Sequence, residues 1–182
     1  NDGGQTMKSF LKAFSVAVVA FAFPAYAADE DILPEPTDDI SSYRTAGDWT
    51  IFQNATRGSC FITRTDESNG TAVQIGLTKD QQAGYIGVFS KTADIQEGVK
   101  DISILVNDNI YVGKSKAFSQ SLNDGYKGGY VLSNNKQLRL DLEKGGTMVA
   151  FPDSPYMVII DLKGAGNAIY EGRECNKKLQ GE

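Results

Sequence analysis

The sequence contains two cysteines, Cys60 and Cys175, which are 115 positions apart. Cys60 lies in a short alternating stretch that predicts a β-strand, on the same face as Ile62. Around Cys175, small and apolar residues recur at intervals of four, three and four, the spacing of one helix face, and these are Ala168, Gly172, Cys175 and Leu179. Both cysteines therefore point inward, and we expect a disulfide that fastens a C-terminal helix to an early strand. Closing such a loop stabilises the fold by roughly 4–5 kcal/mol on chain-entropy reasoning.

The N-terminal region has the order of features found in a secretory signal peptide. After Met7 come two lysines, an apolar run of eleven residues at 13–23, a proline, and an Ala-Tyr-Ala cleavage pattern ending at Ala27. A membrane span needs about 20 apolar residues, so the run is too short to be one. We expect residues 1–6 to be an extension and 7–27 a signal peptide. Export also favours a disulfide between the two cysteines.

The segment that follows the predicted cleavage site is acidic. Residues 28–40 contain six acidic residues, two prolines and no basic residue, which is typical of a disordered leader. It could dock on a basic partner or simply keep the exported chain soluble. The rest of the mature chain, 41–182, has the length of one domain and carries 16 acidic and 16 basic residues. A neutral domain of this kind is a poor candidate for binding nucleic acid or anionic membranes.

Short alternating segments separated by Gly and Asn turns run through the domain. This pattern predicts an all-β fold, an antiparallel β-sandwich or barrel-like sheet with one C-terminal α-helix. The expected strands are 48–53, 59–65, 71–77, 85–90, 102–106, 110–112, 128–133, 136–142, 147–151 and 157–162.

Three local expectations follow from the C-terminal part of the pattern. In 136–142, three leucines alternate with polar residues, so we expect Asp141 and Glu143 together on the solvated face of a strand. The segment 157–162 is apolar on both faces, which predicts a strand covered on both sides. Asn167 is expected to cap the start of the terminal helix.

The amino-acid composition excludes several catalytic mechanisms. The sequence has no histidine, and the expected disulfide uses both cysteines. Serine–histidine and cysteine–histidine catalysis, thiolate chemistry and cysteine or histidine metal sites are therefore excluded. We also find no phosphate-binding glycine loop. We expect no enzyme activity, no cofactor and no metal.

Two features remain as candidate functional residues. Asp161 lies in the most apolar predicted strand, where a buried carboxylate would be unusual, although at a strand end it could reach water or a loop amide. Tyr126, Lys127 and Tyr130 belong to a glycine-rich aromatic stretch that could contact a protein or a sugar. The alternative is that these tyrosines pack on the sheet.

The two ends of the domain resemble a known family. The residues concerned are Gly47-Asp48-Trp49-Thr50, Cys60, Leu162-Lys163-Gly164, Ala168 and Cys175, preceded by a signal peptide. This arrangement is similar to the invasion-associated locus B family of small exported bacterial proteins. The resemblance implies an antiparallel β-sandwich in the periplasm or at the cell surface of a Gram-negative bacterium. It also implies a role in host interaction or envelope function without known catalysis.

The function that we expect is binding rather than catalysis. The expected protein is periplasmic, secreted or at the cell surface, has no membrane span once the signal is removed, and binds a protein or glycan partner. The alternatives are a glycan hydrolase that uses two carboxylates and an inhibitor of a host hydrolase.

The disulfide gives the first testable prediction. Mass spectrometry of the unreduced mature protein, after tryptic digestion, should show the peptides that carry Cys60 and Cys175 linked together. Two free thiols would contradict the prediction.

Overall fold

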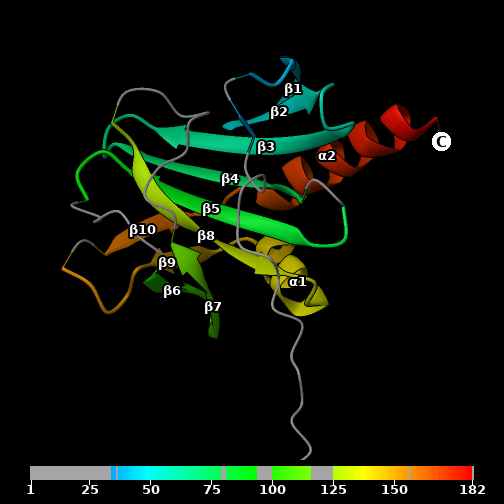
Figure 1. Cartoon of the computed structure of the whole chain (residues 1–182). Helices are drawn as coiled ribbons and strands as arrows, with labels where there is room; N and C mark the ends of the chain where they lie inside the picture. The colour runs from blue at the N-terminus through cyan, green and yellow to red at the C-terminus, as the bar shows by residue number, and fades with distance from the viewer. Residues whose placement is uncertain are drawn as a thin grey trace, which may run out of the picture.

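The computed structural model describes residues 34–35, 37–78, 81–93, 100–115, 125–155 and 157–181 (Figure 1). The predicted extension and signal peptide lie outside the described residues. The elements in chain order are β1 (Ile40–Ala46), β2 (Trp49–Asn54), β3 (Ser59–Asp66), β4 (Thr71–Leu77), β5 (Gly84–Ser90), β6 (Lys100–Val106), β7 (Asn109–Ser115), β8 (Lys127–Ser133), α1 (Lys136–Lys144), β9 (Thr147–Ala150), β10 (Val158–Asp161) and α2 (Ala165–Gln180).

The strands form a sheet in the order β1-β2-β3-β4-β5-β8-β7-β6-β9-β10, and neighbouring strands are antiparallel. Among the described residues, β7 and β8 share one register pair, Lys114 with Tyr130. The sheet therefore divides there into two parts, β1–β5 with β8, and β7, β6, β9 and β10. This is the mostly antiparallel, sandwich-like all-β fold with a C-terminal helix that the sequence pattern predicts.

One hydrophobic core joins the two parts of the sheet to the C-terminal helix. It includes Ile62 and Val88 from the first part and Ile104 and Met148 from the second. Trp49 is fully buried in this core, and its Nε1 donates a hydrogen bond to the carbonyl oxygen of Lys163 at 3.0 Å. The tryptophan therefore connects β2 to the turn that begins α2.

The predicted disulfide is present. Cys60 on β3 and Cys175 on α2 are bonded, with their Cα atoms 6.1 Å apart. Beside it, the backbone N–H of Cys60 donates to Oδ1 of Asn176 at 2.8 Å. The predicted helix face is also confirmed, because Ala168, Gly172 and Cys175 are buried and Leu179 packs against the core. The terminal helix is thus held to β3 by a covalent bond and a hydrogen bond.

The start of α2 differs from the prediction. The helix begins at Ala165, and the preceding residue, Gly164, has the left-handed φ of 81°. No side chain caps this end, so the prediction that Asn167 is the cap is wrong. A glycine suits this position because a side chain would strain a positive φ.

The last strand, β10, is covered on one face only, so the predicted double coverage is wrong. Val158 and Ile160 are buried, whereas Ile159 is 59% exposed. β10 ends the strand order, and its outward residue continues a row of apolar side chains across four strands, Ile159–Val149–Leu105–Ile110. β10 is therefore apolar for two reasons: Val158 and Ile160 belong to the core, and Ile159 belongs to the apolar row on the outer face.

The segment predicted as the strand 136–142 is a helix, α1. Asn135 caps it, with its Oδ1 accepting a hydrogen bond from the backbone N–H of Gln137 at 2.9 Å. Leu138 and Leu142, four residues apart, are buried, while Leu140 is 48% exposed. The i, i+4 pair Leu138 and Leu142 fits one face of a strand or of a helix, and the cap at Asn135 favours the helix.

The segment before the first predicted strand also belongs to the sheet. Residues 40–46 form the edge strand β1. The end of the predicted leader is ordered as well, because Asp38 accepts hydrogen bonds from Arg57 Nε at 2.6 Å and from Asn54 Nδ2 at 2.7 Å. Both side chains of the Asp38–Arg57 pair are 6% exposed. The prediction of disorder is therefore wrong at Asp38.

The three leucines of α1 give a test of this correction. Leu138→Ala and Leu142→Ala should each lower the free energy of unfolding by about 2–5 kcal/mol, because each leaves a cavity in a packed region. Leu140→Ala should change it by less than about 0.5 kcal/mol, as expected for an exposed position. Urea unfolding of the three variants measures the difference. Equal losses at all three positions would point to a strand instead.

Candidate ligand pocket

A pocket with a volume of about 150 Å³ lies where α1, α2 and strands β3–β5 meet. Figure 1 shows the two helices on the same side of these strands. Apolar residues from each element make its walls, and they include Ile62, Ile75, Leu138, Leu142 and Ile169. Cys60 of the disulfide also lines it. The wall that α2 provides is therefore held in place covalently.

Two glycines of α2 allow the close packing that forms these walls. A Cβ at position 172 would lie 3.1 Å from Cγ2 of Ile62, so Gly172 lets the helix approach β3. A Cβ at position 166 would overlap the carbonyl oxygen of Glu143, so Gly166 lets α2 approach the end of α1. Small residues at such crossings bring backbones close together.

Two arginines stand at the opening of the pocket. The side chains of Arg139 on α1 and Arg173 on α2 line it and are 45% and 56% exposed. Both point to the same carboxylate, with Arg139 Nη1 at 3.0 Å and Arg173 Nη1 at 3.8 Å from Glu143 Oε1. The pocket thus has an apolar interior and a positively charged rim.

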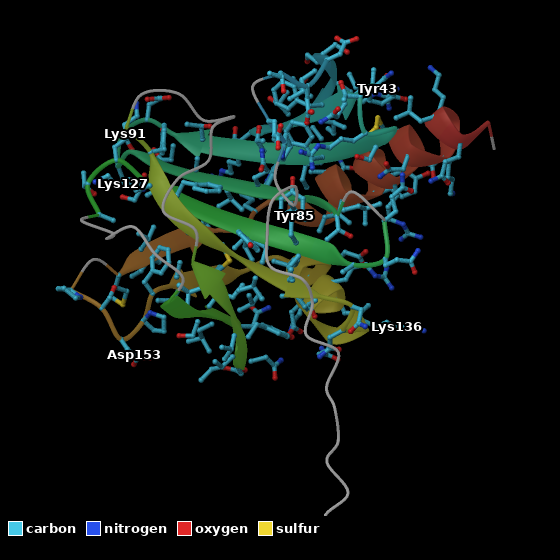
Figure 2. All side chains as sticks on the ribbon, viewed as in Figure 1. Tyr43, Tyr85, Lys91, Lys127, Lys136 and Asp153 are labelled. Atoms are coloured by element: carbon cyan, nitrogen blue, oxygen red, sulfur yellow. A yellow bond between two sulfur atoms is a disulfide. The ribbon has the colours of Figure 1, made fainter. Side chains whose placement is uncertain are left out.

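Among the polar side chains that line the pocket, Asn176 makes hydrogen bonds within the protein. Asn176 accepts a hydrogen bond from Cys60, and its Nδ2 donates to the carbonyl oxygen of Gly172 at 3.0 Å. The Tyr85 hydroxyl is buried and has no hydrogen-bond partner among the described residues (Figure 2). Burial raises the pKa of the Tyr85 phenol, so this group stays neutral.

The aromatic stretch singled out in the sequence lies elsewhere and is mostly buried. Tyr126 and Tyr130 are 6% and 2% exposed, which matches the alternative of packing on the sheet. Lys91 Nζ lies 4.7 Å from the centre of the Tyr126 ring. Figure 2 shows Lys91 and Lys127 at the end of the sheet far from Lys136, the first residue of α1. Of the three predicted contact residues, Lys127 is thus the one that offers an exposed side chain.

Asp161, the other candidate, is exposed at the end of β10. Its Oδ1 accepts a hydrogen bond from the backbone N–H of Lys163 at 2.9 Å, and its carbonyl oxygen accepts one from Arg64. This is the alternative in which the carboxylate reaches a loop amide. A turn-forming carboxylate of this kind has no feature of a buried catalytic acid.

A buried carboxylate is found instead at Asp141, which was predicted on a solvated face. It is 6% exposed and accepts three side-chain hydrogen bonds, from Tyr111 Oη at 2.6 Å, Asn109 Nδ2 at 2.8 Å and Gln137 Nε2 at 2.9 Å. The prediction is wrong because α1 turns Asp141 toward the β6–β7 hairpin. The bond from Tyr111 is the main cause of the lowered pKa of Asp141, and burial together with this bond raises the pKa of Tyr111 to about 12. Asp141 is therefore an ionised anchor between α1 and the hairpin.

Two kinds of feature are absent from the described part of the chain. Within it, no group of three or more histidine, cysteine, aspartate or glutamate residues could hold a metal ion. None of its helices combines the length and the apolar character that crossing a membrane requires.

No family model, no curated protein and no solved structure matches this chain. The function is therefore argued from the pocket. Its residues were not found from the sequence, because they come from six separate elements, β3, β4, β5, β8, α1 and α2, and share no linear motif. The available signals were the inward positions of Cys60 and Gly172 and the helical spacing of Leu138 and Leu142.

The Asp141 network gives a pH-dependent prediction. Because the pKa of Asp141 is lowered in the folded state, its carboxylate contributes stability above the unfolded pKa of about 4, and this contribution is lost as the pH falls through the folded pKa. Asp141→Asn should lower the free energy of unfolding by about 1–3 kcal/mol at pH 7. The deficit should shrink as the pH falls below about 4. Urea unfolding from pH 7 to pH 2 measures both effects.

Asp153, which is exposed, provides the matched control. Asp153→Asn should follow the wild type within about 0.5 kcal/mol at each pH. A deficit in Asp141→Asn that stays constant down to pH 2 would contradict the role assigned to its charge.

Proposed function

We propose that this is a non-enzymatic exported protein of the periplasm or cell surface that acts by binding a partner, and that the partner binds at the pocket between α1, α2 and β3–β5. The observation that carries the proposal is the preformed apolar cavity with a charged rim. Binding sites of proteins are commonly concave, mostly apolar and largely formed in advance, with a few polar groups that orient the ligand.

The covalent attachment of one pocket wall supports this proposal. The Cys60–Cys175 bond holds α2 against β3, so little order has to be gained when a ligand enters. Sites that are formed in advance lose less free energy to ordering on binding. A disulfide of this kind also fits an oxidising compartment outside the cytoplasm.

The sequence resemblance adds the biological setting to the proposal. Membership of the invasion-associated locus B family would place the protein in the periplasm or at the cell surface of a Gram-negative bacterium, with a role in host interaction or envelope function. The carboxylate hydrolase is less well supported, because Asp141 serves as an anchor and Asp161 belongs to a turn.

If the pocket is the binding site, the wild-type protein should retain a ligand from an extract, and a variant whose pocket is filled by a larger side chain should not. Ile75→Phe adds volume inside the pocket, and Ile110→Phe, at a position 67% exposed, adds the same group outside it. The mature proteins are incubated with bacterial envelope extract and with host-cell extract and washed, and retained molecules are identified by mass spectrometry. Wild type and Ile110→Phe should retain a molecule that Ile75→Phe loses, with all three folded by circular dichroism.

A different result would favour the rival function. Equal retention by all three proteins would exclude the pocket as the binding site. Glycan turnover that Asp161→Asn abolishes in a folded protein would replace binding with hydrolysis.

A further inference from the structure

The rim of the pocket holds more positive than negative charge. Arg139 and Arg173 come from different helices and converge on one carboxylate, that of Glu143. Of the residues that line the pocket, the two arginines are the charged ones. With Glu143 counted, the three groups leave one positive charge unbalanced at the opening.

The two arginines already bind a carboxylate, that of Glu143. Arg139 and Glu143 are four residues apart on α1, and Arg173 reaches the same carboxylate oxygen from α2. Guanidinium groups bind carboxylates with directional hydrogen bonds. These side chains are about half exposed, so their pairing with Glu143 is weak and can be exchanged.

The interior sets the size of the apolar part of a ligand. An apolar cavity of about 150 Å³ is large enough for a molecule of the size of benzene. The walls around Ile75, Leu138 and Ile169 offer an apolar ligand dispersion contacts and no buried charge.

We infer that the pocket takes a small carboxylate amphiphile, with an apolar group of about six carbons between the helices and the strands and a carboxylate between Arg139 and Arg173. The inference rests on the proposed function and adds the chemical class of the ligand. The ligand carboxylate neutralises the excess charge of the rim while its chain displaces water from the pocket. A cationic head group would meet the two arginines and is rejected.

Three probes with six carbons each test the inference, namely hexanoate, hexanol and hexylammonium, each titrated into the mature protein by calorimetry. Hexanoate should bind more tightly than hexanol, and hexylammonium should show no binding. In Arg139→Gln/Arg173→Gln, the affinity for hexanoate should fall roughly 10- to 100-fold, the loss expected when hydrogen bonds to a charged group are removed. The affinity for hexanol should not change.

Arg44 provides a matched control, because it is an exposed arginine paired with a glutamate, Glu171, at 2.6 Å and does not line the pocket. Arg44→Gln should bind hexanoate like the wild type. Equal loss in Arg44→Gln and in the double variant would show a general effect of net charge and overturn the inference.

The outcomes separate this inference from the proposed function. If hexanol binds as tightly as hexanoate and Ile75→Phe weakens both, the carboxylate part is wrong while the pocket remains a binding site. If hexanoate does not bind the wild type, the ligand class is wrong, and the retention experiment with extracts still decides the proposed function by itself.

Discussion

The attachment of α2 to the sheet is the interaction on which the rest of the structure depends. The Cys60–Cys175 bond, the hydrogen bond from Trp49 to the turn before the helix, and the bond from Cys60 to Asn176 hold the helix at both ends. The disulfide closes a loop of 115 residues and contributes about 4–5 kcal/mol on chain-entropy reasoning. Without this attachment the core would lose the layer that covers β2 and β3, and the pocket would lose a wall.

The pocket wall that α1 provides depends on the buried carboxylate of Asp141. Asp141 is ionised inside the protein, and three donors from the β6–β7 hairpin and from α1 replace the water that it loses. A buried carboxylate is tolerated when its hydrogen bonds are satisfied in this way. The network fixes the rotation of α1, so that Leu138 and Leu142 face inward and Arg139 reaches the pocket opening. A carboxylate that resembles a catalytic residue in composition is here a structural one.

Together the two anchors explain why the site suits binding. Both helices are held in place before any ligand arrives, which lowers the entropic cost of association. The interior is apolar, and the two arginines at the opening are about half exposed, so they could attract an anion without being buried themselves. A ligand of the class that we propose would be selected by its size and its charge. The exposed apolar row across β10, β9, β6 and β7 is a separate feature of the surface, at the far end of the strand order from β1.

Local patterns in the sequence determined most of the strands, the inward face of α2 and the partnership of the two cysteines, because these follow from a period of two, a period near 3.6, and a count of two. Tertiary structure decided the rest. Leu138 and Leu142 fit a strand or a helix equally well by spacing, and Asp161 and Asp141 exchanged their expected environments once β10 lay at an edge and α1 was a helix. The pocket was decided at this level too, since its walls come from residues as far apart as Cys60 and Asn176, which only packing brings together.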